Sequence, residues 1–143
     1  MSMIDLKRIE LSVDCKNPEE AIKMAGKLLL YDDFIKESYI KGAIENFRKN
    51  GAYFVIAPGI AIPHSRPEDG VNKTGISLVV LKNPLEFGNK INDPVKIIIF
   101  LATKGNDEHV KYISRLARIF GEEENISIIL NAKLKKEIIQ IFE

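Results

Sequence analysis

The chain contains only two histidines, His64 and His109, and these are its side chains best suited to chemistry near neutral pH. His64 lies in a segment where glycine and proline on both sides predict a stiff surface loop, Gly59-Ile60-Ala61-Ile62-Pro63-His64-Ser65-Arg66-Pro67. A neutral imidazole, the main form above a pKa of about 6.5, can attack phosphorus without a separate strong base. The pattern favours a nucleophile at His64, and the alternative is a loop histidine without function.

Asn106 is predicted to cap a helix whose first turn contains His109. The N–H groups of a first turn lack partners within the helix, and the helix dipole favours an anion there. His109 can therefore donate a hydrogen bond to a phosphoryl oxygen, or it can be an incidental first-turn residue. Asp107 and Glu108 suit this helix end electrostatically, but they would repel a phosphate if they pointed towards it.

Two arginines are candidates for binding a phosphoryl group. Arg48 stands near the predicted end of a helix, where its planar set of donors can hold phosphate. A cation is also favourable at a helix C-terminus without any ligand. Arg66 is two residues from His64, although its side chain need not face the same way. Cys15 is expected to be a packing residue, and two histidines without a Cys-x-x-Cys pair predict no metal site.

The composition predicts a single globular domain over residues 1–143. Hydrophobic residues make up 45% and charged residues 29% of the chain, which excludes a disordered protein. The net charge of +1 supplies no excess of cations for nucleic acid or a membrane surface, so neither is an expected partner. The longest apolar runs, Ile76–Leu81 and Ile97–Ala102, are shorter than the roughly 20 residues of a membrane span. A single cysteine and a start without a signal-peptide pattern predict a cytoplasmic protein.

Alternating strands and helices must position the candidate residues. The apolar periodicity and the turn residues predict strands at Leu6–Val13, Tyr53–Ala57, Ile76–Leu81 and Val95–Leu101. Helices are predicted from Asn17, through Tyr39 to Gly51, from Asn106 to Gly121, and in two short pieces within Glu122–Glu143. This alternation is typical of an α/β fold, here a single domain with a mixed central β-sheet flanked by α-helices on both faces.

The side-chain periodicity also predicts which residues face the core. In the first strand Ile9, Leu11 and Val13 are expected on one face. The segment Lys82-Asn83-Pro84 is predicted to be a turn after the first long apolar strand. The buried stripe of the third helix is predicted to consist of Val110, Ile113, Leu116, Ala117 and Phe120.

The segment Ala57–His64 resembles the phosphohistidine signature of the fructose/mannitol-type (type 2) enzyme IIA (EIIA) domains of the bacterial sugar phosphotransferase system (PTS). Further landmarks follow in the order of that family over essentially the whole chain: Glu19-Glu20-Ala21-Ile22, Tyr39-Ile40-Lys41-Gly42-Ala43-Ile44, Asn92-Asp93-Pro94-Val95 and Asp107-Glu108-His109. Ala57-Pro58-Gly59 and Arg66-Pro67-Glu68 look more like the ascorbate-type subgroup than the mannitol proteins. Ser65 departs from the motif, which usually carries glycine, alanine or cysteine there.

The resemblance implies a phosphotransferase, without a metal or organic cofactor, that is phosphorylated on His64. It implies that His109 supports the phosphoryl group, and that Arg48 stabilises it as a basic residue does in some members. The donor would be phosphorylated HPr and the acceptor an enzyme IIB (EIIB) protein during sugar uptake. The alternative is a regulatory protein of the same fold, whose phosphorylation state signals to a transcription or transport protein.

HPr and EIIB must dock in turn on one patch around His64, so an apolar rim is expected there. Ile60 and Ile62 are predicted to form this rim together with Phe54, and Ser65 and Arg66 to complete the interface. The transported sugar and the oligomeric state stay open, a homo-oligomer being one alternative.

Overall fold

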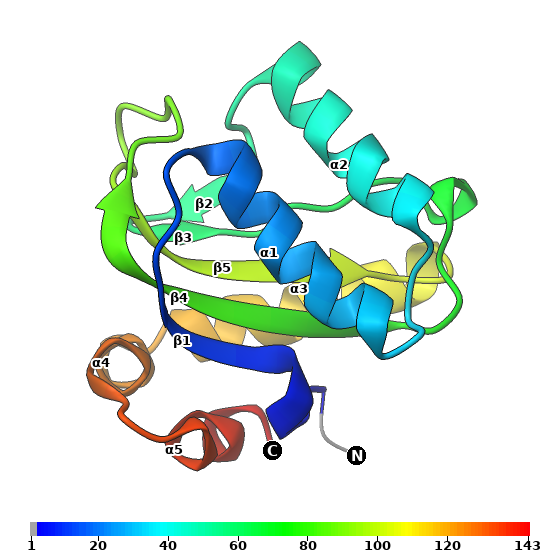
Figure 1. Cartoon of the computed structure of the whole chain (residues 1–143). Coiled ribbons are helices and arrows are strands. Elements are labelled where there is room, and N and C mark those ends of the chain that lie inside the picture. Colours follow the sequence, from blue (N-terminus) through cyan, green and yellow to red (C-terminus); the bar gives the residue numbers. More distant parts are fainter. Residues whose placement is uncertain (1–2) are drawn as a thin grey trace.

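A five-stranded mixed sheet with the strand order β1-β4-β5-β3-β2 forms the centre of the molecule (Figure 1). The computed structural model describes residues 3–143. The strands are β1 (Ile9–Val13), β2 (Val55–Ala57), β3 (Ile60–Ala61), β4 (Gly75–Leu85) and β5 (Val95–Ala102). The helices are α1 (Pro18–Tyr31), α2 (Glu37–Asn50), α3 (Asn106–Phe120), α4 (Glu123–Asn131) and α5 (Lys135–Ile139), with 3-10 turns at Leu6–Arg8, Pro67–Asp69 and Gln140–Phe142.

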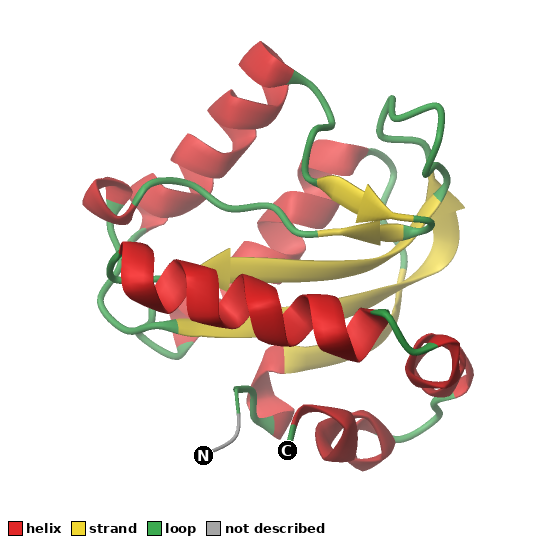
Figure 2. Cartoon of the chain, turned by 180° about the vertical axis from the view of Figure 1, so that it is seen from behind, coloured by secondary structure: helices red, strands yellow, loops and turns green. Residues whose placement is uncertain are grey.

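Helices cover both faces of the sheet, as predicted. On one face α1 and α2 bury an apolar layer that includes Ala25, Leu29, Tyr39 and Ala43 against residues of β4 and β5. On the other face α3, α4 and α5 bury a second layer that includes Leu116, Ile129 and Ile138 (Figure 2). The predicted α/β fold with a mixed sheet is therefore confirmed. Within residues 3–143 no helix has both the length and the apolar character needed to cross a membrane.

The two long apolar strands β4 and β5 lie at the centre of the sheet, as their composition predicts. The turn predicted at Lys82-Asn83-Pro84 is wrong, because β4 continues to Leu85. Beyond Leu81 the neighbouring strand β1 has ended, so that side of β4 is a free edge. A proline is tolerated at such an edge because its missing N–H costs no ladder hydrogen bond.

The first strand is shorter than predicted and changes face. Asp5 accepts a hydrogen bond from the Lys7 N–H and caps a 3-10 turn, so β1 begins only at Ile9. Ser12 has a positive φ of 53° at an irregularity in the pairing of β1 with β4. This bulge turns Val13 towards the layer under α1 and α2, whereas Leu11 packs on the opposite layer, so the prediction of one common face is wrong for Val13.

Helix α3 begins one residue earlier than predicted, and two residues of its predicted buried stripe are exposed. Gly105 is the cap and Asn106 is the first helical residue, so the predicted Asn106 cap is wrong. Ile113, Leu116 and Phe120 pack into the core as predicted. Val110 and Ala117 are exposed instead. Figure 2 shows that α3 begins beyond the ends of the central strands, which accounts for the exposure of Val110 near the start of the helix.

The topology places the two predicted histidine segments at the same edge of the sheet. Strand β3 pairs in parallel with β5, so the carboxyl ends of both strands point in the same direction. The loop that carries His64 follows β3, and α3, which carries His109, follows β5 after a short connection. In Figure 1 these two segments meet at the right-hand side of the sheet.

The loop between β4 and β5 braces the edge hairpin that leads to His64. The carboxylate of Asp93 accepts hydrogen bonds from the backbone N–H groups of residues 87–89, at 3.0, 2.8 and 3.0 Å. The side chains of Asn89 and Asn92 donate to the carbonyl of Val55 in β2, at 3.3 and 2.9 Å. The Asn92-Asp93 landmark therefore has a structural role on the side of the sheet away from the histidines.

Replacement of Asp93 by alanine should lower the free energy of unfolding by about 2 kcal/mol, because it removes the common acceptor of three N–H groups. Urea denaturation followed by circular dichroism measures this change. Asp14→Ala is the matched control, since Asp14 is an exposed carboxylate with no hydrogen-bond partner among residues 3–143 and should change stability by less than about 0.5 kcal/mol. Equal stability of the two variants would contradict the role of Asp93.

Candidate active site

The structure brings the two histidines together at the sheet edge. The ring centroids of His64 and His109 are 5.3 Å apart, with an angle of 56° between the ring planes. Both side chains are half-buried, so each ring is held by its surroundings and still reaches solvent. A group bound to His64 would therefore lie within reach of His109.

A backbone carbonyl determines which nitrogen of His64 is available. Nδ1 of His64 lies 3.0 Å from the carbonyl oxygen of Ile62. A carbonyl oxygen can only accept, so Nδ1 carries the proton and donates to it. Nε2 then holds the free lone pair, and it is the nitrogen that can attack an electrophile.

The loop around His64 is fixed by backbone hydrogen bonds on both sides. The Leu101 N–H in β5 donates to the Pro63 carbonyl at 3.1 Å, and the Ile62 N–H donates to the Phe54 carbonyl at 2.9 Å. The loop therefore continues alongside β5 after the two-residue strand β3 has ended. The predicted stiff segment is bound to the sheet directly before His64.

His109 is a neutral hydrogen-bonding group close to the first turn of α3. Burial lowers its pKa, and the neighbouring His64 lowers the pKa further. Its backbone N–H donates to the Gly105 carbonyl at 3.0 Å, so only the three preceding helical N–H groups lack a partner within the helix. Asp107 and Glu108 are exposed at this helix end.

The apolar surface next to the histidines differs from the predicted rim. Ile60, Ile62 and Phe54 are only 0%, 1% and 3% exposed and belong to the core layers, so the prediction that they contact a partner is wrong. Ile60 and Ile62 are two residues apart in an extended segment, so both side chains point towards the layer under α3. Exposed apolar side chains instead include Tyr53, which is 48% exposed and contacts the ring of His64, and Val110, which is 66% exposed and directly follows His109.

Tyr53 was not predicted as part of the site. Its ring lies edge-on to the ring of His64, with centroids 6.1 Å apart and an interplanar angle of 81°. Tyr53 also packs edge-on against the buried Phe54. It follows the end of α2 by three residues, and the local sequence gives no signal that this aromatic ring reaches a loop eleven residues later.

The two arginines are engaged with carboxylates. Arg48 makes a bidentate interaction with Glu19 on α1, with Nε–Oε2 at 2.7 Å and Nη2–Oε1 at 2.6 Å. Arg66 is exposed, and its Nη2 atom lies 3.2 Å from Oδ1 of Asp69. The arrangement of Arg48 gives the predicted phosphate-stabilising role no support, and that role stays a prediction.

A model of the family "Phosphoenolpyruvate-dependent sugar phosphotransferase system, EIIA 2" matches residues 2–143. The chain belongs to this family. It is therefore a phosphotransferase protein that carries a phosphoryl group, and the similarity to fructose/mannitol-type EIIA domains is confirmed.

Related proteins match this EIIA protein over nearly its whole length. The ascorbate-specific PTS system EIIA component of Escherichia coli (strain K12) is 37% identical, over 99% of this chain and 93% of that protein. The solution structure of the mannitol-specific cryptic phosphotransferase enzyme IIA of Escherichia coli is 34% identical, with a TM-score of 0.87, over 98% of this chain and 95% of that one. The mannitol enzyme IIA of Escherichia coli in complex with phosphorylated enzyme IIB is 23% identical and shares the fold, with a TM-score of 0.85 over 97% of this chain and 96% of that one.

Titration of the two imidazoles by NMR should give His109 a pKa below about 6.5, the value of an unperturbed histidine. His64→Gln should raise the pKa of His109 but leave it below that value, because burial, the larger cause, remains.

The same pKa has a consequence for stability. The unfolded chain binds a proton at His109 more readily than the folded protein does, so the free energy of unfolding should fall as the pH drops below about 6.5. His109→Gln should reduce this pH dependence in urea denaturation. A folded-state pKa of His109 at or above 6.5 would contradict both expectations.

Proposed function

We propose that this EIIA protein accepts a phosphoryl group from phosphorylated HPr on Nε2 of His64 and passes it to an EIIB protein in the cytoplasm. The observation that carries the proposal is the free Nε2 of a half-buried His64, next to a neutral His109 at the start of α3. The unpaired, buried Cys15 is compatible with a reducing compartment.

The proposed reaction consists of two in-line displacements. In the first, the lone pair of Nε2 attacks the phosphorus atom, the new N–P bond forms, and the bond to the donor nitrogen on HPr breaks. The ring of His64 gains positive charge as this bond forms, and the Ile62 carbonyl stabilises that charge through the Nδ1–H group. In the second displacement a nucleophile on EIIB, a cysteine in families of this kind, takes the phosphoryl group and the electrons of the N–P bond return to Nε2.

His109 and the start of α3 supply the environment for the phosphoryl oxygens. A neutral imidazole can donate one N–H to a phosphoryl oxygen, and the lowered pKa of His109 favours this neutral form. The N–H groups of the first helical turn and the helix dipole favour the negative charge of the group. Phosphoryl transfer depends mainly on such alignment and charge stabilisation.

We further infer that the two partners dock on the exposed apolar surface next to His64. Tyr53 contacts the ring of His64, and the exposed Val110 directly follows His109 in α3. A small apolar surface of this kind suits the transient complexes of a carrier that must release each partner. Arg66, 73% exposed in its side chain, can add a charged contact at the rim.

The acceptor is proposed to be an EIIB protein of an ascorbate-type system. The similarity of Ala57-Pro58-Gly59 and Arg66-Pro67-Glu68 to that subgroup favours this assignment. The name of the 37% identical relative in Escherichia coli supports it.

Incubation with enzyme I, HPr and ³²P-labelled phosphoenolpyruvate should give wild-type protein an acid-labile label. His64→Ala should abolish the label, because the attacking nitrogen is lost. His109→Gln should still accept the label, but at least about tenfold more slowly, because a donor to the phosphoryl oxygens is altered. Label on His64→Ala would place the phosphorylated residue elsewhere, and an unlabelled wild type would overturn the proposed function.

Labelled protein should transfer its phosphoryl group to an ascorbate-type EIIB faster than to mannitol-type or fructose-type EIIB proteins. Single-turnover chase experiments with equal concentrations of each acceptor measure the rates. The proposed subgroup is wrong if a mannitol-type acceptor reacts fastest. Val110→Asp should slow transfer to every acceptor, because it places a charge in the proposed apolar surface.

A further inference from the structure

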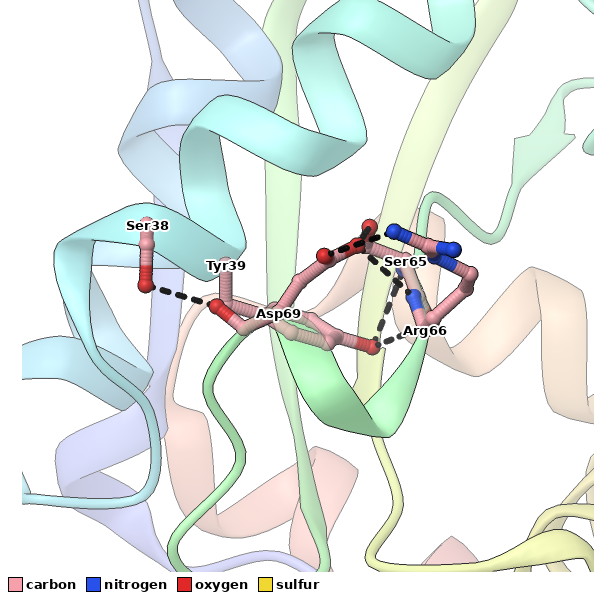
Figure 3. A network of polar contacts seen from close by, with 5 residues as sticks. All are labelled: Ser38, Tyr39, Ser65, Arg66 and Asp69. Carbon is pink, nitrogen blue, oxygen red and sulfur yellow. Dashed lines mark hydrogen bonds and ion pairs between the residues drawn. The ribbon is translucent and has the colours of Figure 1, made fainter.

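Ser65, the residue directly after His64, is held through both its backbone and its side chain. Its N–H donates to the hydroxyl of Tyr39 at 3.0 Å, and its own hydroxyl donates to Oδ2 of Asp69 at 2.5 Å. The Tyr39 hydroxyl lies 2.8 Å from the Leu101 carbonyl, to which it donates. Figure 3 shows how these side chains converge from α2, the loop and the following 3-10 turn.

Asp69 is the centre of this network. Besides the Ser65 hydroxyl, its carboxylate accepts from the Arg66 N–H at 3.3 Å and from the Arg66 guanidinium at 3.2 Å. Its backbone carbonyl accepts from the Ser38 hydroxyl at 2.6 Å, which ties the 3-10 turn to the start of α2. The hydrogen bond from Ser65 is the main cause that lowers the pKa of the Asp69 carboxyl, so the group is charged at neutral pH.

Gly42 provides the space for this interaction. A Cβ atom at Gly42 would lie 2.5 Å from the Ser65 hydroxyl oxygen and 3.0 Å from Oδ2 of Asp69. The first distance is far shorter than a van der Waals contact. The helix α2 can therefore lie directly against the loop only because this position has no side chain.

We propose that Asp69 is a positioning residue for His64 and that it acts through the Ser65 hydroxyl. This inference rests on the proposed function, because it assigns His64 as the phosphorylated residue. The backbone of Ser65 is covalently joined to His64, so fixing Ser65 restricts the direction in which the His64 side chain points. With Asp69 in place the imidazole is held in line for the displacement before the donor protein binds.

The size of the effect follows from the chemistry. In-line displacement loses rate when the nucleophile samples other orientations, because the orientation then has to be regained in the transition state. Without Asp69, the Ser65 hydroxyl loses its acceptor, and only the backbone of the residue is still held, through its N–H and its carbonyl, which lies 3.1 Å from the Tyr39 hydroxyl. A loss of about tenfold in the maximal transfer rate is expected, which corresponds to about 1.4 kcal/mol.

The test measures single-turnover transfer of ³²P from phosphorylated HPr, at several HPr concentrations, to wild type, Asp69→Ala, Ser65→Ala and the double variant. Both single variants should lower the maximal rate about tenfold with a half-saturating HPr concentration within twofold of wild type. The double variant should be no slower than either single one, because both changes break the same hydrogen bond. Asp14→Ala, at the opposite edge of the sheet, is the matched control and should react at the wild-type rate.

Two further variants separate positioning from simple loss of structure. Asp69→Asn keeps an acceptor for the Ser65 hydroxyl and should recover part of the rate. Gly42→Ala improves the helix propensity of α2 but displaces the Ser65 hydroxyl, so it should slow transfer although neither partner of the hydrogen bond is changed. ¹⁵N NMR of the imidazoles should show a smaller share of the Nδ1-protonated form of His64 in Asp69→Ala than in wild type.

Three results would overturn the inference: a wild-type rate for Asp69→Ala, additive losses in the double variant, or a loss confined to the half-saturating HPr concentration. The last result would make Asp69 part of the docking surface. An unlabelled wild-type protein would instead overturn the proposed function, so the two failures are distinguishable.

Discussion

The parallel pairing of β3 with β5 is the constraint on which the site depends. β3 contains only two residues, yet backbone hydrogen bonds extend the pairing at both of its ends. Gly59 accepts from the Ile97 N–H before the strand, and Pro63 accepts from the Leu101 N–H after it. A slip by one residue would turn Ile60 and Ile62 out of the core and move His64 by roughly 3.3 Å along β5, which changes its distance from His109. The register of the shortest central strand therefore sets the distance between the two imidazoles.

The charges around the histidine pair suit a group that must be released again. A guanidinium next to the phosphoryl group would stabilise the phosphorylated protein along with the transition state. In this protein Arg48 is bound by Glu19 on another helix, and Arg66 is bound by Asp69. In the proposed function the phosphoryl oxygens face neutral His109 and the helix terminus, and both groups interact with an anion more weakly than a free cation does. On the proposed function, this arrangement suits transfer more than tight retention of the phosphoryl group.

Sequence reasoning selected His64 and His109 because the chain has two histidines and one of them lies in a distinctive rigid motif, and the structure brings the two rings together. It predicted the central strands and the helices well, because continuous apolar runs and caps such as Asn17, whose side chain accepts from the Glu20 N–H at 2.9 Å, are local signals. It failed where a distant contact decides the outcome. The exposure of Val110 depends on how far α3 extends past the sheet edge. The ion pair of Arg48 with Glu19 joins residues 29 positions apart.

The misplaced apolar rim has a more specific cause. Ile60 and Ile62 follow a glycine in a motif that also contains prolines, which predicts a surface loop. The motif is instead a strand and its extension, and the side chains that alternate with Ala61 are required to fill the layer under α3. A loop interpretation exposes such residues, whereas pairing with β5 buries them. Only the position of β5 distinguishes the two, and that position is set by long-range topology.

The hydroxyl of Tyr39 forms hydrogen bonds that hold the loop and that do not depend on pH in the physiological range. This group links the end of β5, through the Leu101 carbonyl, to the loop residue Ser65. Burial raises the pKa of Tyr39 to about 12, so the phenol keeps its proton and its role as donor throughout the physiological range. The Asp69 carboxyl is shifted in the opposite direction and keeps its charge. The tethers of the loop therefore keep their protonation states across the neutral range, and the frame that holds His64 does not loosen there.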